Sequence, residues 1–299
     1  MRLSTSTCIY FNRPDGTKAD LHDSIRTCGQ AGYRVMDMNW HDCAVFRTPF
    51  WDADWEDWVK SLKETACQAG VSFSQSHAHF FNYCDTTLKD RSWLDETVRR
   101  SIVGSSTLGI PWVVTHAATD WESDHPLRDS KRKSIAYLKP IIEQAGELGV
   151  GIAIENLWEM NIAPKRRYTA FAEELMDLVD SLPYPNVGVC WDLEHSAIMQ
   201  QDPMQVAKML GPKLKATHVS DYYDKGYDHV LPFQGVSDWD AELQALASID
   251  YQGDFTYEAH RCTMRLPIEL VPAVLRYSVD LGNYLIGKYN HYKEEQQQA

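Results

Sequence analysis

Eight short apolar runs alternate with helical segments along this chain of 299 residues, and this alternation limits its fold more than any other feature. The runs are rich in apolar and β-branched residues, as buried strands are, and several of the helical segments end at a glycine. The predicted strands are 2–9, 33–40, 71–77, 112–116, 151–156, 187–191, 214–219 and 254–259. The predicted helices are 21–31, 55–69, 93–108, 135–148, 169–181, with Thr169 as its N-cap, 203–210, 240–248 and 268–289.

Eight strand–helix units predict an α/β fold with a parallel sheet closed into a (β/α)₈ barrel, which typically needs about 250 residues. A doubly wound open sheet is the competing architecture. However, the first predicted strand is not followed by a GxGxxG pattern, and the chain has no P-loop sequence. Since no linker-like stretch divides the chain, we expect one barrel domain over 1–290 and a polar tail over 291–299. The tail ends in KEEQQQA, which we expect to lack regular structure.

Ionisable residues close most of the predicted strands, at the end of a barrel where active sites form. A single buried Glu or His at such a place is often only a hydrogen-bonded scaffold residue. Here the pattern recurs on consecutive strands, and we expect the last four strands to bring their side chains together. The residues at strand ends are His77, His116, Glu155, Asp192, His218 and Glu258.

The last four of these residues form a candidate metal site. Three carboxylates in close proximity repel one another, so either a cation is bound or one carboxylate is protonated. Three carboxylates and one imidazole suit Mn²⁺, Mg²⁺ or Co²⁺ better than a structural zinc, which prefers Cys and His. We favour a metal site.

Four strings resemble a known family: IAIENL, VGVCWDLEHS, KATHVSD and FTYEAH. They are similar to signatures of the sugar-phosphate isomerase/epimerase family, within the xylose isomerase-like TIM barrel superfamily. The string DHVLPFQGVSDW, which contains Gly235, resembles a loop of that family. The resemblance implies a catalytic divalent ion, with Mn²⁺ first and Mg²⁺ or Co²⁺ as alternatives, held by Glu155, Asp192, His218 and Glu258. It also implies that Glu155 and Glu258 transfer a proton next to the carbonyl of a keto sugar or related polyol.

Further residues are expected to bind the substrate: His195, His116, His77, Trp158, Asn161 and Asp224. For His195, the resemblance implies contact with a substrate oxygen, although orientation of Asp192 is an alternative role. Well-understood ketose epimerases of the family have Glu where this chain has Asn161 and Arg where it has Asp224, so the sugar contacts differ. Lys165, Arg166 and Arg167 could bind an anionic group of the substrate, although a solvated basic patch is favoured.

Three other functions remain open on the same residues. A lyase could begin with the same proton abstraction: a dehydratase of keto-inositols or keto-acids, or an enzyme that cleaves C-glycosides of 3-keto sugars. An inactive sugar-binding or partner subunit would be expected to have lost a ligand, and all four are present. A metal-dependent DNA nuclease is disfavoured by the formal net charge of −13, because DNA binding relies on cationic contacts.

The charge and the cysteines also bear on partners and compartment. Nucleic acid is not an expected partner, and no apolar run approaches the length of a membrane span. Seven cysteines without a CxxC pair suggest reduced thiols, so we expect a cytoplasmic protein with a small-molecule substrate. A homo-oligomer remains open.

Overall fold

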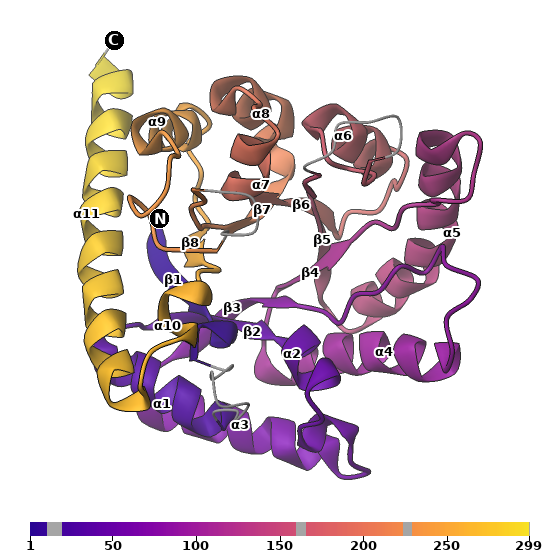
Figure 1. Cartoon of the computed structure of the whole chain (residues 1–299), viewed down its shortest axis with the longest axis horizontal. Helices are drawn as coiled ribbons and strands as arrows, with labels where there is room; N and C mark the ends of the chain where they lie inside the picture. Colours follow the sequence, from indigo (N-terminus) through magenta and orange to yellow (C-terminus); the bar gives the residue numbers. More distant parts are fainter. Residues whose placement is uncertain (11–19, 160–165, 224–228, 299) are drawn as a thin grey trace.

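The computed structural model describes residues 1–10, 20–159, 166–223 and 229–298, and eight parallel strands in these ranges form one barrel (Figure 1). The strand order is β7-β6-β5-β4-β3-β2-β1-β8, and a parallel bridge between Val219 and Tyr257 joins the two ends of the sheet. The α/β barrel predicted from the sequence is therefore confirmed. The strands are β1 (Arg2–Ser6), β2 (Val35–Asn39), β3 (Ser72–His77), β4 (Trp112–His116), β5 (Gly151–Glu155), β6 (Val187–Asp192), β7 (Leu214–His218) and β8 (Asp254–Tyr257).

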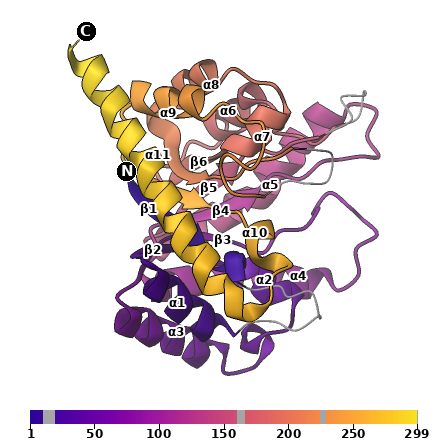
Figure 2. The same ribbon diagram turned by 60° about the vertical axis from the view of Figure 1, so that its left-hand side comes forward.

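The helices form an outer layer around the strands, and α11 runs along the outside beside β1 and the N-terminus (Figure 2). The α-helices are α1 (Leu21–Ala31), α2 (Trp40–Val45), α3 (Trp55–Ala69), α4 (Arg91–Leu108), α5 (Pro126–Glu147), α6 (Ala172–Asp180), α7 (Leu193–Ile198), α8 (Pro203–Leu210), α9 (Trp239–Ser248), α10 (Arg261–Met264) and α11 (Val271–Gln298). Short 3₁₀ helices occur at Thr7–Tyr10, Pro49–Trp51, Gly211–Lys213 and Ile268–Leu270. Within the described ranges, none of the helices combines the length and apolar character that a bilayer span requires.

Alternation along the strands divides their side chains between two environments. On β5, Ile152 and Ile154 belong to the large apolar core that packs against the helices. Ala153 instead belongs to a separate small cluster inside the barrel, together with Val114, Cys190 and Ala216. Glu155 lies two residues after Ala153, so the same alternation directs it to the barrel interior at its carboxyl end.

The amino end of the barrel is filled by the Trp112 ring. A Cβ atom placed on Gly151 would lie 2.3 Å from this ring, so only glycine allows the ring to occupy that position. The Nζ atom of Lys215 lies 5.7 Å from the centre of the same ring. The interior is therefore closed at this end, and the opposite end is the one available for a site.

The structure corrects three local predictions. Thr169 has a left-handed backbone, with φ of 65°, and the cap of α6 is Phe171 rather than Thr169. Helix α5 begins at Pro126, well before the predicted start at 135, because proline is favoured in the first turn of a helix. The KEEQQQA end, predicted to be unstructured, continues α11 as far as Gln298. An ion pair from Lys293 to Asp250 holds this part of the helix against the loop after α9.

Candidate metal and active site

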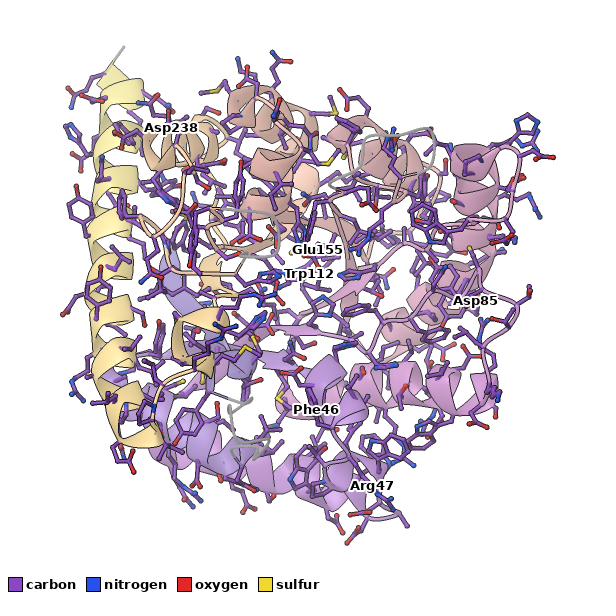
Figure 3. All side chains as sticks on the ribbon, viewed as in Figure 1. Phe46, Arg47, Asp85, Trp112, Glu155 and Asp238 are labelled. Atoms are coloured by element: carbon purple, nitrogen blue, oxygen red, sulfur yellow. The ribbon has the colours of Figure 1, made fainter. Side chains whose placement is uncertain are left out.

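Four side chains from adjacent strands meet at the carboxyl end of the barrel. Glu155, Asp192 and His218 end β5, β6 and β7, and Glu258 directly follows β8. One potential ligand atom from each lies within 4.8 Å of the others. Nδ1 of His218 lies 3.0 Å from Oε1 of Glu155 and 3.4 Å from Oε2 of Glu258. Figure 3 places Glu155 near the centre of the ring of strands.

Asp192 serves both β6 and the helix that follows it. It is the N-cap of α7, and its Oδ1 accepts a hydrogen bond of 2.8 Å from the backbone N–H of His195. The side chain is fully buried, yet Oδ2 has no hydrogen-bond partner in the described part of the chain. A buried carboxylate oxygen without a donor is costly, and a cation would satisfy it.

The protonation of the cluster is consistent with this need for a cation. Burial raises the pKa of Asp192 well above its usual range, and the charges of Glu155 and Glu258 raise it further. Burial raises the pKa of Glu258 as well. For Glu155, burial is outweighed by the charge of His218 and by hydrogen bonds from three histidines, so its pKa is lowered well below the usual range.

The donor set fits a hard divalent cation. It offers carboxylate oxygens and one imidazole nitrogen, which suit Mn²⁺, Mg²⁺ or Co²⁺. A bound cation would favour the charged forms of Asp192 and Glu258 and would supply a partner for Oδ2 of Asp192. These four residues as ligands, and the metal's identity, remain predictions.

His77 and His116 form a second layer of contacts on Glu155. Their Nε2 atoms lie 3.2 Å and 3.0 Å from Oε2 of Glu155 and 3.1 Å from each other. Burial lowers the pKa of His116 to about 4. For His77, the hydrogen bond to Glu155 and the charge of Glu155 outweigh burial, and its pKa is raised. Both Nε2–H groups can donate to the same oxygen of Glu155, and the opposite pKa shifts lead us to assign the additional proton to His77 and to leave His116 neutral.

His195 lies on the pocket side of Asp192. Its Nδ1 lies 2.8 Å from the carbonyl oxygen of Asn156 and therefore donates to it. Burial lowers the pKa of His195, so the ring is neutral at pH 7 and Nε2 carries a lone pair. Asn156 also bonds both backbone groups of Asp192, which fixes β5 against β6 at the site.

Asp37 is a residue of the site region that the sequence analysis missed. It lies in β2, is fully buried, and accepts a 2.9 Å hydrogen bond from Nε2 of Gln75. Its Oδ2 also lies 3.5 Å from Nε2 of His218, an ion-pair distance on the opposite side of the ring from Glu155, and Nε2 makes no hydrogen bond to the described residues. This position allows Asp37 to keep the His218 proton on Nε2, which leaves Nδ1 free to bind a metal. The available signal was an aspartate within the otherwise apolar run VMDM.

Replacing Asp37 with Asn should therefore weaken divalent-ion binding by about 10–100-fold, because an amide holds the imidazole less firmly. Isothermal titration of the chelated protein with Mn²⁺ measures this change directly. Ser4→Ala is the matched control, since Ser4 is also fully buried in the barrel and has no hydrogen bond from its hydroxyl in the described residues. Equal Mn²⁺ affinity in Asp37→Asn and wild type would contradict this role.

Two members of the cluster, Glu155 and Glu258, line a pocket of about 580 Å³. Of the predicted substrate-binding residues, His77, His116, His195 and Trp158 line it, whereas Asn161 and Asp224 lie outside the described residues. The sequence analysis did not identify Phe80, Phe81 and Trp121, which also line the pocket. They lie in loops after β3 and β4, where periodicity gives no signal.

Asp221 organises the loop between β7 and α9. It accepts hydrogen bonds from the backbone N–H groups of Phe233, Gly235 and Ser237 and from the indole of Trp239. A Cβ atom on Gly235 would lie 2.2 Å from the carbonyl oxygen of Tyr222 and 2.3 Å from Oδ1 of Asp221. Glycine is therefore required at this point of the loop.

Gly235→Ala should lower the free energy of unfolding by about 1–3 kcal/mol, because the methyl group must displace backbone. Chemical denaturation compares it with Gly287→Ala in α11, where a Cβ would meet no atom within 4 Å. We expect the control to be neutral or to stabilise the helix, since alanine is the better helix former. A neutral Gly235→Ala would show that the loop adapts.

Comparison with known proteins agrees with the fold. Residues 25–277 match the profile of a family described as "Xylose isomerase-like TIM barrel". An uncharacterized protein of Sinorhizobium fredii, y4fM, is 27% identical over 208 residues, which cover 67% of this chain and 63% of that protein. An inosose isomerase of Bacillus velezensis is 28% identical over 161 residues, covering 52% of this chain and 55% of the relative.

Two further matches cover a smaller part of the chain or share its fold at low sequence identity. An inosose dehydratase of Bacillus thuringiensis is 29% identical over 110 residues, covering 31% of this chain and 36% of the relative. The matched stretches thus span less than two thirds of these relatives. The solved structure of an L-ribulose 3-epimerase superposes with a TM-score of 0.75 at 15% identity, covering 100% of this chain and 98% of that one, which shows a shared fold. The resemblance noted in the sequence is confirmed: the chain belongs to the xylose isomerase-like TIM barrel family.

Proposed function

We propose that this chain is a divalent-metal-dependent isomerase or epimerase that moves a proton next to the carbonyl of a keto sugar or related polyol. One observation carries the proposal: Glu155 and Glu258 belong to the four-donor cluster and also line the pocket. Proton transfer needs an acid or base within hydrogen-bond reach of the reacting carbon. Two carboxylates that line the same pocket can remove a proton from a substrate and return one to it.

The chain's own residues have distinct parts in this reaction. When bound, a divalent ion such as Mn²⁺ would polarise the substrate carbonyl and acidify the neighbouring C–H. Glu258, whose side chain keeps 14% exposure, faces the pocket, while both oxygens of Glu155 are held by histidines. The neutral Nε2 of His195 can accept a hydrogen bond from a substrate hydroxyl.

The other predicted substrate-binding residues also have roles in the proposed reaction. His116, also neutral, can accept a second hydroxyl, and the proton on His77 maintains the charge of Glu155. Trp158 offers a flat surface to one side of the substrate. Asn161 and Asp224 stay proposed contacts on the sequence argument alone.

A lyase on the same residues is the second candidate. The curated relatives include both an inosose isomerase and an inosose dehydratase. Both names describe chemistry on a keto-inositol. After the same proton abstraction, loss of a hydroxyl or of a C-glycosidic substituent from the adjacent carbon would give a lyase instead of an isomerase.

Incubation with Mn²⁺ in D₂O tests and separates these activities. Keto sugars and inososes are followed by NMR and mass spectrometry. Deuterium in the substrate together with a new stereoisomer or positional isomer supports the proposal. Loss of water or of a substituent identifies the lyase, and the absence of both exchange and elimination across the panel would argue against either activity.

A further inference from the structure

The pocket is larger than a single sugar requires. A hexose has twelve non-hydrogen atoms, which would fill about 360 Å³ even at the roughly 30 Å³ that a water molecule occupies in the liquid. The pocket measures about 580 Å³, a size that elsewhere holds ligands of more than one ring. A sugar bound at the four-donor cluster would therefore leave an outer part of the pocket unfilled.

The walls of this outer part are mainly aromatic. Its lining includes Phe80, Phe81, Trp121, Leu157 and Trp158, all outside the four-donor cluster. The Phe80 ring is stacked on His41, with ring centres 3.9 Å apart, and is tilted against His116, with ring centres 4.1 Å apart. These contacts fix the position of Phe80 in the wall of the pocket.

Two polar side chains of the outer part, those of Asn82 and Thr119, are hydrogen-bonded to the protein itself. The amide of Asn82 donates to the carbonyl oxygen of Thr119 and accepts from the N–H of Cys84. The hydroxyl of Thr119 accepts a hydrogen bond from the N–H of Tyr168. A second sugar ring, which needs many hydrogen-bond partners, fits these walls poorly, whereas an aromatic ring fits them well.

Arg167 adds a cation at the edge of this surface. Its Cζ lies 5.7 Å from the centre of the Trp158 ring, its side chain is 48% exposed, and its Nε lies 3.9 Å from Oε2 of Glu159, beyond hydrogen-bond distance. Arg166 differs, because Glu174 holds it by two hydrogen bonds. The two neighbouring arginines therefore have different roles. Arg166 is structural, whereas Arg167 has donors available for an oxygen substituent on a ring that stacks on Trp158.

We infer that the outer part of the pocket binds an aromatic aglycone, so that the substrate is an aryl-substituted sugar rather than a free monosaccharide. This inference rests on the proposed function for the position of the sugar, at the four-donor cluster. The aglycone stacks on Trp158, and Arg167 donates hydrogen bonds to a hydroxyl or carboxylate on its ring.

Binding measurements test this inference without turnover. Phenyl and methyl β-D-glucosides, and the corresponding β-D-galactosides, are titrated into the Mn²⁺-loaded protein by calorimetry. We expect a phenyl glycoside to bind about ten-fold more tightly than its methyl counterpart. A 4-carboxyphenyl glycoside should gain further affinity. Trp158→Leu should remove the phenyl preference, and Arg167→Gln, an exposed and structurally mild change, should remove only the gain from the carboxylate.

Trp51→Leu is the matched control, because Trp51 is also partly exposed but packs at a tilt against Trp93 and does not line the pocket. It should keep the full phenyl preference. The inference is overturned if no phenyl glycoside binds more tightly than its methyl counterpart, or if Trp158→Leu leaves the preference unchanged. These outcomes are separate from the proposed chemistry: deuterium exchange into free keto sugars could persist without any phenyl preference, and aryl binding could persist without exchange.

Discussion

Glu155→Gln and Glu258→Gln should each slow solvent-deuterium exchange into the substrate by about 10²–10⁴-fold, the usual contribution of a positioned acid or base. The amide keeps the shape of the carboxylate but cannot take up the substrate proton. Metal analysis should still find some divalent ion in both variants, since Asp192, His218 and one glutamate remain. Exchange is followed by NMR in D₂O under saturating Mn²⁺.

Glu242→Gln is the matched control for these two variants. Glu242 is also buried, but it lies in α9 and does not line the pocket. Burial raises its pKa well above the usual range, which favours the neutral form of the side chain that glutamine resembles. Glu242→Gln should catalyse deuterium exchange into the substrate at the wild-type rate. Normal exchange in either Glu155→Gln or Glu258→Gln would refute its assignment as a proton-transfer group.

Removal of the divalent ion should cost the protein about 2.7 kcal/mol of stability, if the ion is present at 100 times its dissociation constant. After chelation, three carboxylates and an imidazole are buried without a metal ion. Protonation of the carboxylates then reduces their mutual repulsion. The measurement is thermal unfolding with and without EDTA, followed by addition of Mn²⁺, Mg²⁺ or Co²⁺. Restoration of the melting temperature identifies which ions bind.

Asp192→Asn serves as the comparison for chelation. The amide can still cap α7 through its oxygen, but it cannot supply a charged ligand through the position of Oδ2. The variant should fold, and its melting temperature should respond less to EDTA and Mn²⁺ than that of the wild type, because three of the four donors remain. A wild-type protein whose melting temperature does not respond to chelation, and which contains no divalent ion, would contradict the metal site.

The barrel could be predicted from the sequence because its strands carry a repeated local signal. On β5 to β8, the alternation of apolar residues also identified the strand ends, and hence the four residues that meet there. Parallel strand pairing then brings these residues together, since Asp192 lies opposite His218 in the β6–β7 register. The short helices α2 and α7 were not predicted, since each has six residues and depends on a side-chain cap from Asn39 or Asp192.

The surroundings of the site could not be predicted in the same way. Asp37 acts across the barrel on His218, a contact between residues of β2 and β7 that no local pattern encodes. Trp158 and Arg167 meet at the pocket edge, and Phe80 approaches from the loop after β3. Trp40, the first residue of α2, is buried against Phe50 and donates a hydrogen bond to Ser105.

The central claim is that this site moves protons only when it holds a divalent ion. Its most direct test is a titration of the chelated protein with Mn²⁺, in which bound metal and deuterium exchange into a responsive keto sugar are measured on the same samples. We predict that exchange is absent without metal, rises in proportion to occupancy and reaches its plateau at one ion per chain. Exchange that is unchanged by chelation, or full occupancy without exchange in any keto sugar, aryl-substituted keto sugar or inosose, would contradict the claim.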